Sequence, residues 1–497
     1  MLGGYVMSID NGLTTTKAVI FNLDGHEIAT VVVDTVIENK GDWAEIDMEL
    51  QWKNTAAVIK AALAKSGIDA GEVIGIGNSG HGAGIYLLDQ SGNPVRKAIS
   101  SMDGRAVDII ENWQRNGITN YALTYQNMWL GQPVPLLYWL KRNEPANYQK
   151  VHTILMAKDW IRYQLTGELN LEYTDASNSG LVNLTTKTFD PEIFSPYGIP
   201  EIYEKLPPLR KSMAVVGYVT RQAALETGLK EGTPVIGGLF DVVACALGSG
   251  IYDNKKYSIT AGTWNINSGV EEKIFASPDI MEWVLYADNE KYMCIDSSAT
   301  SAVNLEWFIK NIIDGLAPES FHQDNIYQLI DQNIVRFTPE EVQIIYLPFI
   351  YKSKLAKKTD GGFFGIKASH NVYHLLRAVY EGVAFAHLKH IDNLRKGGIV
   401  KQIGSLSGGA SKSPFWGQLF ADVLNIEIVT TKASQVGALG IAIAATVATG
   451  VYKNIEDAVR VMVREQQRYY PNQNTGAYRE KYRRFNQIID LYDHNIL

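Results

Sequence analysis

The sequence predicts a mixed α/β protein with two large domains. Its 497 residues exceed the length that one hydrophobic core usually organises. Short β-rich runs alternate with amphipathic helical stretches, which is typical of an α/β architecture. A strand, a turn containing glycine and threonine, and a returning strand occur at 5–21 and again at 256–268. We therefore expect two related domains, at 1–250 and 251–497.

The first strand pair carries the features around which the chain is organised. Asn11-Gly12 favours the positive φ of a tight turn, and Thr14, Thr15 and Thr16 place hydroxyls at the start of the second strand. Such a turn can bind phosphate oxygens through its N–H groups. Asp10 would repel those oxygens without a cation, so the pair predicts a divalent metal, for which Mg²⁺ fits best. The alternative is an ordinary polar hairpin at a sheet edge.

Strands and helices continue to alternate through the rest of the N-terminal half. Asp47 is suited to cap an amphipathic helix that runs to about Lys65. Periodic tryptophans and leucines predict helices across most of 106–165. The expected strands lie at 27–36, 73–76 and 84–88, with a turn at 89–92.

The segment Gly75-Ile76-Gly77-Asn78-Ser79-Gly80 matches the pattern G-x-G-x-x-G of dinucleotide-binding proteins. That pattern needs a helix after the glycines, because the helix N-terminus receives the pyrophosphate. Gly82, Gly84 and a strand-like run follow instead. We therefore reject the dinucleotide-binding interpretation.

One carboxylate lies between a glycine pair and an apolar helix. Asp241 follows Gly237-Gly238-Leu239-Phe240 and precedes Val242-Val243-Ala244. Burying an unpaired carboxylate is costly, so this placement needs a reason. Asp241 could cap the helix N-terminus. We favour the other interpretation, in which Asp241 faces the domain cleft and accepts a proton from a substrate hydroxyl that attacks phosphate.

The second half repeats the opening arrangement. Strands are expected at 256–259 and 264–268, with Gly262 and Thr263 in the turn between them. Two such hairpins, one per half, suggest a nucleotide between two related domains. A later strand ends near 404–410 and precedes a helix at 414–424. The C-terminal stretch is charged and predicts a solvated helix face, with Arg464, Arg468, Arg479, Lys481, Arg483 and Arg484.

His81, Asp103 and Arg105 come from segments that end near the first domain's strands. An imidazole and a carboxylate can each hydrogen-bond neighbouring hydroxyls, which suits a polyol. The alternative is a surface Asp–Arg pair and a structural histidine. From these residues alone, that alternative is favoured.

The composition narrows the class of protein. A hydrophobic fraction of 46% is typical of a globular protein, and a net charge of −7 argues against general nucleic-acid binding. The apolar windows at 233–250 and 438–449 indicate buried core elements, not membrane spans. Cys245 and Cys294 are too few for a disulfide framework or a zinc site. Because residues 1–4 lead directly into a strand without a signal-peptide pattern, we expect a cytoplasmic protein.

Taken in order, these motifs resemble the FGGY family of carbohydrate kinases, and the resemblance covers nearly the whole chain. It is carried by the Asp10-x-Gly-x-Thr-Thr hairpin, Trp43-Ala44-Glu45-x-Asp47, Gly-His-Gly at 80–82, Met102-Asp103-Gly104-Arg105, Gly237-Gly238-x-x-Asp241, Gly262-Thr263 and Ser407-Gly408-Gly409-Ala410.

The resemblance implies two actin-like, ribonuclease H-like domains, with ATP between them and the sugar deeper in the cleft. Asp241 would be the catalytic base, and His81 and Asp103 would contact sugar hydroxyls. Asp10 would hold Mg²⁺ through water, and Asp241 is a second candidate for such a contact. The nucleotide would be bound by Gly12, Thr14, Thr15, Gly262 and Thr263 at its phosphates and by Gly408, Gly409 and Ser413 at its adenosine.

Within the family, 239–243 and 262–264 most resemble the branch of L-xylulose and 3-keto-L-gulonate kinases. The chain differs from many relatives by Ser79-Gly80 in place of Gln-Met, and by Ser101 or Met102 in place of a tryptophan. We expect a kinase for a ketopentose or a related keto-sugar, with D-xylulose or another pentulose or polyol as the alternative. The rival from a different class is a non-kinase actin-like ATPase that couples nucleotide to partner binding. A homodimer is one open possibility.

Overall fold

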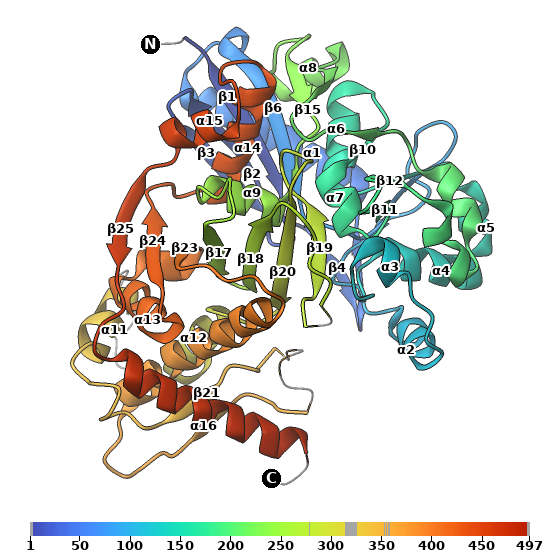
Figure 1. The fold of residues 1–497 in the computed structure, drawn as a ribbon. Helices are drawn as coiled ribbons and strands as arrows, with labels where there is room; N and C mark the ends of the chain where they lie inside the picture. Colours follow the sequence, from blue (N-terminus) through green and yellow to red (C-terminus); the bar gives the residue numbers. More distant parts are fainter. Residues whose placement is uncertain are drawn as a thin grey trace.

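The computed structural model describes residues 3–277, 279–313, 326–351, 353, 355 and 358–494. Two seven-stranded sheets form the centres of two domains, and a lobe of helices and short strands lies beside the first sheet (Figure 1).

The first sheet has the strand order β14-β15-β6-β1-β2-β3, with β16 paired to β6. β1, β2 and β3 form an antiparallel meander, and β6 pairs in parallel with β1. The strands are β1 (Tyr5–Asn11), β2 (Thr15–Asn22), β3 (Glu27–Asp34), β6 (Val73–Gly80), β14 (Val215–Tyr218), β15 (Pro234–Ile236) and β16 (Leu239–Phe240).

The second sheet repeats this topology. Its order is β19-β20-β18-β17-β23-β24-β25, and β17, β18 and β20 form the meander while β23 and β24 follow β17 in parallel. The strands are β17 (Lys256–Ala261), β18 (Asn265–Glu271), β19 (Glu282–Leu285), β20 (Tyr292–Ser298), β23 (Ile403–Ser407), β24 (Glu427–Thr431) and β25 (Glu465–Tyr469). The faint echo between the two hairpins in the sequence therefore reflects two sheets of one plan.

Helices with one apolar face cover the two sheets. Asp47 caps α1, accepting a hydrogen bond from the Leu50 N–H at 3.0 Å as predicted, and α1 packs on β2 and β3. The helices around the two sheets are α1 (Met48–Ser66), α9 (Asp241–Gly248), α12 (Val372–Lys396), α13 (Pro414–Leu424), α14 (Val436–Ala448), α15 (Ile455–Met462) and α16 (Thr475–Asp493), with α10 (Val303–Phe308), α11 (Ile326–Ile334), β21 (Ile345–Leu347) and β22 (Gly362–Phe364) nearby.

The prediction of one solvated C-terminal helix was partly wrong. Arg468 lies in β25, where it pairs with Glu427, and Arg464 precedes that strand. Lys481 of α16 is buried and forms an ion pair with Glu381 of α12. The charged residues of α16 therefore have two roles. Lys481 is buried against α12, whereas most of the other charged side chains of the helix are exposed.

The lobe corresponds to the predicted helical stretch at 106–165, which β9 interrupts. β7 and β9 pair with each other, and α7 packs against β16 and β19. Its elements, with the small strands and helix next to them, are β4 (Glu38–Lys40), β5 (Trp43–Ile46), β7 (Tyr86–Leu88), β8 (Ala98–Ile99), α2 (Val107–Arg115), α3 (Tyr121–Thr124), α4 (Pro133–Asn143), α5 (Pro145–Lys150), β9 (Thr153–Leu155), α6 (Ala157–Thr166), β10 (Leu171–Glu172), α7 (Tyr173–Asn178), β11 (Val182–Asn183), β12 (Thr188–Phe189), β13 (Leu209–Arg210) and α8 (Arg221–Thr227).

The C-terminal half crosses back onto the first sheet. α14 packs against β1 and β6, and the orange-red helices α14 and α15 lie beside the blue strands in Figure 1. Gly75 and Gly77 of β6 make this possible, since a Cβ on either would press against Thr449 or Ile441. The glycines of the rejected dinucleotide motif therefore serve helix–sheet packing. The boundary near residue 250 stays a prediction, to which the structure adds that 436–462 contacts the N-terminal sheet.

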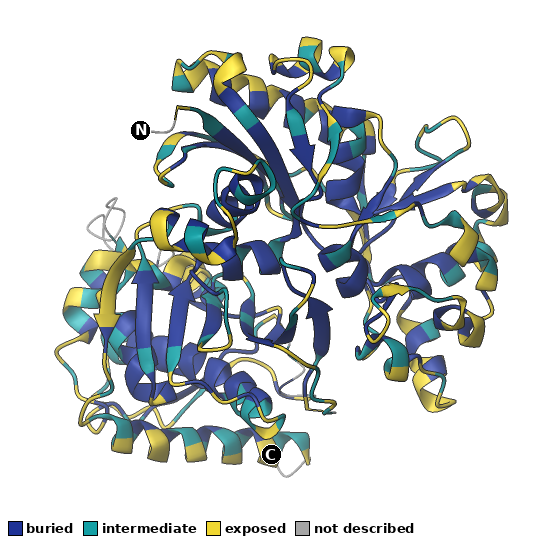
Figure 2. Cartoon of the chain, turned by 45° about the horizontal axis from the view of Figure 1, so that its top comes forward, coloured by how far each residue is buried: buried dark blue, intermediate teal, exposed yellow. Residues whose placement is uncertain are grey.

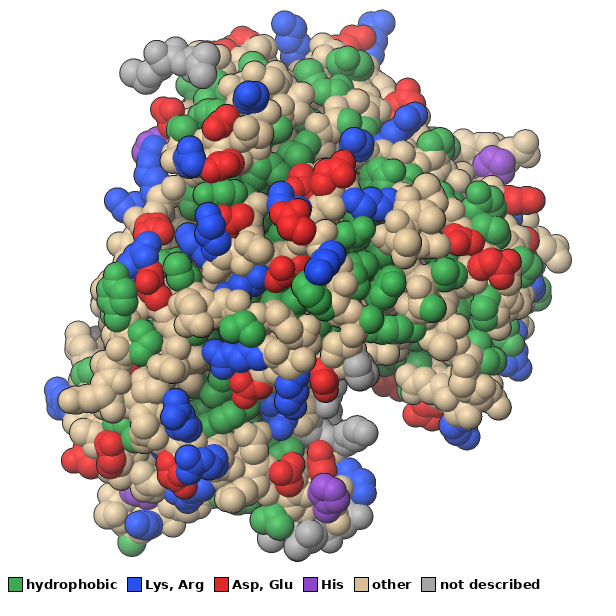
Figure 3. Space-filling view, viewed as in Figure 1, with side chains coloured by type: hydrophobic (Ala, Val, Ile, Leu, Met, Phe, Trp, Pro, Cys, Tyr) green, Lys and Arg blue, Asp and Glu red, His purple; other side chains and the backbone are tan. Residues whose placement is uncertain are grey.

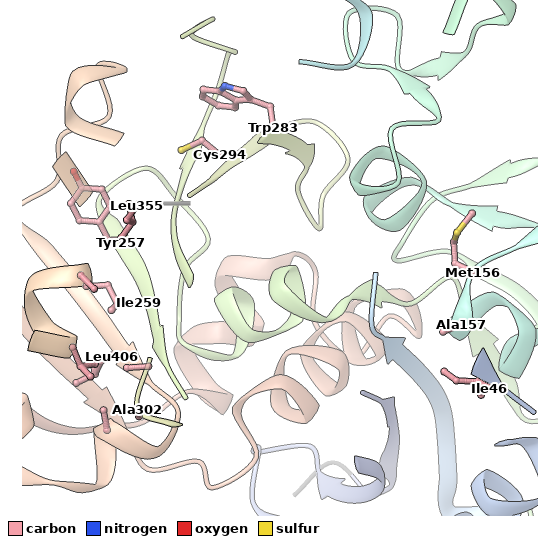
Figure 4. Packing of buried hydrophobic residues seen from close by; sticks show 14 of the residues in the cluster. Ile46, Met156, Ala157, Tyr257, Ile259, Trp283, Cys294, Ala302, Leu355 and Leu406 are labelled. Carbon is pink, nitrogen blue, oxygen red and sulfur yellow. The ribbon is translucent and has the colours of Figure 1, made fainter. Parts of the chain in front are cut away.

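Buried residues concentrate in the strands and on the inner helix faces, whereas the outer faces are exposed (Figure 2). One apolar cluster includes Ile46 and Met156 on the N-terminal side and Tyr257 and Leu406 on the C-terminal side (Figure 4). A second cluster joins Val6 and neighbouring strand residues to α9, α14 and α15. On the face drawn in Figure 3, acidic and basic side chains are interspersed, in keeping with the modest net charge of −7.

Candidate active site

The turn between β1 and β2 brings an acid and a cation together at one sheet edge. Asp10 lies opposite Lys17 in the antiparallel register, and the Gly12 N–H donates to the Thr15 carbonyl at 3.0 Å. Lys17 Nζ is 3.4 Å from one Asp10 oxygen, and the Ser79 hydroxyl donates to the other at 2.7 Å. Asp10 is thus held in place by two neighbours.

The turn between β17 and β18 mirrors the first. The Gly262 N–H donates to the Trp264 carbonyl at 3.3 Å. Thr14 and Thr263, at the tips of the two turns, are both exposed. A Cβ on Gly262 would meet no heavy atom within 4 Å among the described residues, so the space beside the turn is open. Both turns therefore present hydroxyls and backbone groups of the kind that bind phosphate.

Gly408 and Gly409 follow β23 beside the second turn. Gly408 has a φ of 84°, and a Cβ there would lie 2.6 Å from the Ala261 carbonyl oxygen, so only glycine fits. A Cβ on Gly409 would meet no described heavy atom within 4 Å. This combination of a fixed backbone and an open surface fits a nucleotide that rests against the chain.

Ser413, predicted to border the adenosine, begins α13. Its hydroxyl accepts a hydrogen bond from the Trp416 N–H at 3.1 Å and donates to Asp331 of α11 at 2.6 Å. Tyr380 Oη donates to the other Asp331 oxygen at 3.0 Å. Sequence reasoning missed Asp331, because its partners come from two distant helices.

Asp241 is the first residue of α9 (Asp241–Gly248), and the N-cap residue is Phe240. Asp241 therefore does not serve as the N-cap, which was the structural alternative. Loss of solvent raises its pKa well above the ordinary value, and the negative charges of Asp10 and Asp175 raise it further. The sheet edge that carries Asp10 and the helix that carries Asp241 thus face each other closely enough for their charges to interact.

Two glycines fix the helix that carries Asp241. A Cβ on Gly440 of α14 would collide with the Ala244 carbonyl of α9, and a Cβ on Gly248 of α9 would collide with the Val436 carbonyl of α14. The backbones of the two helices therefore touch. Since α14 in turn packs on β1 and β6, this contact links the position of Asp241 to the strand that carries Asp10.

His81 is buried between two hydroxyl groups. Its Nε2 lies 3.1 Å from Tyr86 Oη and its Nδ1 lies 3.3 Å from Ser101 Oγ. Burial lowers the pKa of His81 to about 4. His81 is therefore neutral near pH 7, with one ring nitrogen donating and the other accepting, as a sugar hydroxyl requires.

Asp103 is engaged by its surroundings and is not a surface residue. One oxygen accepts hydrogen bonds from the Arg105 N–H and Nε, and the other accepts from the Ala44 N–H at 2.7 Å and from Arg105 Nη2. The Arg105 guanidinium lies over the rings of Trp43 and Trp139, 4.4 and 4.8 Å from their centres. The Asp–Arg pair of the alternative interpretation is therefore present, but it is buried and does not lie at the surface. The predicted sugar contact of Asp103 stays a prediction.

Sequence reasoning also missed Lys17, Ser79 and one face of α7. The register of the hairpin, in which residue 10 faces residue 17, is the signal that identifies Lys17. The polar run Thr174-Asp175-Ala176-Ser177-Asn178-Ser179 inside a buried segment is the signal for α7.

The described residues contain no group of three or more His, Cys, Asp or Glu that could hold a metal ion by themselves. Asp10 and Asp241 supply two hard oxygen ligands at most. This donor set fits Mg²⁺, which keeps several waters and is completed by substrate phosphates. It does not fit a metal enclosed by protein ligands.

A cavity of about 460 Å³ lies elsewhere. It is bordered by α12, the end of α13 and α16, and neither Asp10 nor Asp241 lines it.

The helices within the described part of the chain include none with the length and apolar character of a membrane span.

Two sheets of one topology, each with a phosphate-binding type of turn, and a carboxylate at the start of the helix between them define a two-domain phosphotransferase of the actin-like class. The chain belongs to the FGGY family of carbohydrate kinases. The model of the FGGY N-terminal domain matches residues 5–248, and that of the FGGY C-terminal domain matches 257–449. The predictions of the family, of the fold class and of a phosphotransferase acting on a sugar hydroxyl are thereby confirmed.

Similar proteins cover the chain almost completely. A probable L-xylulose kinase of Pasteurella multocida (strain Pm70) is 36% identical over 97% of this chain and 98% of its own length. An L-xylulose/3-keto-L-gulonate kinase of Escherichia coli (strain K12) is 35% identical over 98% of this chain and 96% of its own. The crystal structure of xylulose kinase from Rhodospirillum rubrum superimposes with a TM-score of 0.87 at 26% identity, covering 99% of this chain and 100% of that one.

Proposed function

We propose that this carbohydrate kinase transfers the γ-phosphate of ATP to a terminal hydroxyl of a keto-sugar, with L-xylulose or 3-keto-L-gulonate as the favoured acceptor. The observation that carries the choice of sugar is the full-length similarity, at 35–36% identity, to proteins named for these substrates. D-xylulose is the second candidate, supported by a xylulose kinase of Bacillus subtilis (strain 168) at 27% identity.

In the proposed mechanism, Asp241 accepts the proton of the attacking hydroxyl, which lies in line with the γ-phosphate. The raised pKa of Asp241 supports this role, because it makes the carboxylate a stronger base. The turns at Gly12, Thr14 and Thr15 and at Gly262 and Thr263 hold the phosphates, whose charge is greatest during transfer. Lys17 contributes a positive charge at the same edge.

The adenosine is proposed to lie against Gly408 and Gly409, next to Ser413. Asp10, and secondarily Asp241, would hold Mg²⁺ through water, and the metal would supply charge neutralisation between the phosphates. His81 would contact the sugar directly. Asp103 would act indirectly, since Arg105 and the Ala44 N–H occupy its oxygens.

A cytoplasmic location is proposed because both described cysteines are free, Cys245 half-buried and Cys294 buried, as is usual in a reducing compartment. A homodimer is proposed as the oligomeric state.

An ADP-release assay tests this proposal. The purified chain is incubated with MgATP and, separately, with L-xylulose, D-xylulose, L-ribulose, the corresponding polyols and 3-keto-L-gulonate. We expect ADP release to depend on sugar and to be fastest with L-xylulose or 3-keto-L-gulonate. Equal ADP release with and without every sugar would contradict the proposal and support the rival ATPase that couples nucleotide to partner binding.

A further inference from the structure

The helix α7 carries a row of buried polar atoms without hydrogen-bond partners. Both carboxylate oxygens of Asp175, the amide nitrogen of Asn178 and the hydroxyl of Ser179 have none among the residues that the structure describes. All three side chains are at least 98% buried. Residues three and four apart lie on the same side of a helix, so 175, 178 and 179 form one face, which we call the α7 polar face.

Burying such atoms is costly. Each unsatisfied polar group in a protein interior costs on the order of 1–3 kcal/mol, and a carboxylate costs more. Three of them on one helix face require donors and acceptors that the described chain does not supply. Ordered water and a bound ligand are the two candidates.

The α7 polar face lies between the two segments that carry His81 and Asp241. A Cβ on Gly82 would collide with the Asn178 amide nitrogen and would lie 2.5 Å from the Phe240 ring. The Phe240 N–H, one residue before Asp241, donates to Thr174 Oγ1 at 2.8 Å. The α7 polar face is therefore adjacent to the sugar side of the proposed site.

Electrostatic interactions link Asp175 to the same place. The backbone N–H of Ala83, in the loop after His81, lies near enough to the Asp175 carboxylate to lower its pKa, although it forms no hydrogen bond of normal geometry with either oxygen. The charge of Asp175 acts on both Asp241 and Tyr86. Tyr86 in turn lies 3.1 Å from His81 Nε2. Asp175 is thus in electrostatic contact with both residues that are proposed to meet the sugar.

Asp175 is also the least compensated acid of a buried charged cluster. Lys158 Nζ lies 2.6 Å from Asp159, 3.3 Å from Glu172 and 3.7 Å from Asp175. Asp159 has a second cation, Arg162 at 2.8 Å. Of the three acids near Lys158, Asp175 is the most distant from its ammonium group. Loss of solvent raises the pKa of Asp175 to about 7.

Glu172, in contrast, is fully hydrogen-bonded. Its oxygens accept from the Thr174 N–H at 2.7 Å, the Thr174 hydroxyl at 2.8 Å, the Asp175 N–H at 3.3 Å and the Ser212 hydroxyl. The cluster therefore satisfies its structural acids and leaves the acceptor capacity of Asp175 available.

We propose that the α7 polar face is a sugar-recognition surface, on which Asp175 accepts hydrogen bonds from hydroxyl groups of the bound keto-sugar while Asn178 and Ser179 hydrogen-bond its other oxygens. This inference rests on the proposed sugar kinase function and assigns recognition to a helix that none of the sequence motifs includes. A carboxylate whose two oxygens have no hydrogen-bond partner among the described residues suits neighbouring hydroxyls of an open-chain sugar. Because such hydroxyls differ in direction between epimers, the α7 polar face would also contribute to discrimination among pentuloses.

Steady-state kinetics of Asp175→Asn and Ser179→Ala test the proposal. Ser177→Ala is the matched control, since the Ser177 hydroxyl on the same helix is satisfied by the Thr174 carbonyl and the Leu285 N–H. We expect Asp175→Asn to raise the KM for sugar about 10- to 100-fold, the range for a lost hydrogen bond to a charged group. The KM for ATP should stay within about twofold, because in the proposed complex α7 contacts the sugar and not the nucleotide.

Ser179→Ala should raise the sugar KM about 3- to 10-fold, whereas Ser177→Ala should leave it unchanged and lower Tm instead. The sugar-induced rise in Tm, measured without ATP, should shrink in Asp175→Asn and Ser179→Ala but not in Ser177→Ala. Parent-like sugar KM values in both test variants, accompanied by a lower Tm, would overturn the proposal and assign the face to buried water. If Asp175→Asn fails to fold, the Ser179→Ala and Ser177→Ala pair decides.

The two proposals fail differently. A parent enzyme that phosphorylates no sugar in the panel would overturn the proposed function and this inference with it. An active parent whose sugar KM is insensitive to both test variants would overturn only the recognition role of α7.

Discussion

At the scale of single residues, Asp241 combines a catalytic advantage with a cost in stability. Its pKa is raised by loss of solvent and by the charges of Asp10 and Asp175. An acid whose pKa is higher in the folded state than in the unfolded state destabilises the fold when it is ionised. This cost is present at neutral pH and disappears as the pH falls below the ordinary carboxyl pKa. Active sites commonly retain such destabilising groups.

The substitution Asp241→Asn should therefore lower activity and increase stability. Sugar-dependent ADP release should fall at least about 100-fold, because loss of a general base has effects of that size. The free energy of unfolding at pH 7 should rise by roughly 1 kcal/mol, which is typical when a strained active-site group is removed. Thermal unfolding at pH 7 and at pH 4 measures the second effect, and the gain should vanish at pH 4. An active variant, or one equally stabilised at both pH values, would contradict this assignment.

The pH dependence of kcat/KM for sugar should report Asp241 and not His81. Since Asp241 must be ionised to accept a proton, activity should fall as the pH decreases through its pKa, which lies well above that of an ordinary aspartate. His81, whose pKa is lowered to about 4, stays neutral over this range. In His81→Asn the absolute rate should drop while the midpoint stays in place. A midpoint that moves with His81 would assign the titration to the histidine.

At the scale of elements, the α9–α14 contact determines where Asp241 lies. Gly440 and Gly248 let the two backbones touch, and a side chain at either position would push the helices apart. We expect Gly440→Ala to cost about 1–3 kcal/mol, as overpacking does, and to lower kcat by displacing Asp241. Gly476→Ala in α16 is the control, because a Cβ there meets no described heavy atom within 4 Å. Chemical denaturation and ADP release measure the two effects, and parent-like values in Gly440→Ala would refute the contact.

Local signals in the sequence identified most individual elements. Asp47 caps α1, and α13 spans Pro414–Leu424, both as predicted from capping residues and apolar periodicity. The glycine and threonine runs near residues 12 and 262 likewise identified both hairpins. The positive φ expected at Asn11-Gly12 was wrong, since neither residue adopts it. Such features depend on residues a few positions apart, so one sequence is sufficient to predict them.

Features that depend on distant pairs could not be predicted. Asp103 was expected at the surface or in a sugar contact, but it is buried and its oxygens accept hydrogen bonds from Arg105 and from the Ala44 N–H, 59 positions away. The unpartnered atoms of α7 become apparent only when the loop after β6 is placed against it. The Asp103–Arg105 pair is local, but its burial and the packing against α7 join segments separated by tens of residues, and no spacing in the sequence encodes such contacts.

At the scale of the whole molecule, the N-terminal domain is completed by the C-terminal half. α14 and α15 supply apolar residues to the cluster that contains Val6, Val19 and Phe21. We expect a fragment of residues 1–254 to expose this surface and to lack a cooperative thermal transition, as molten-globule states do. Adding 432–463 through a flexible linker should restore a cooperative transition. Circular dichroism and binding of an apolar dye distinguish the fragments, and cooperative unfolding of 1–254 alone would refute the expectation.

The hydrogen bond from the Ser8 hydroxyl to the Ala438 carbonyl, 2.7 Å long, joins residues 430 positions apart. A ribosome that adds about 5–20 residues per second needs on the order of 20–90 s to reach Ala438 after it has added Ser8. During that interval α14, which packs on β1 and β6 in the folded protein, has not yet been synthesised. We therefore expect a period during synthesis in which the apolar surface that α14 later covers is exposed to other chains, as transiently exposed apolar surface favours aggregation.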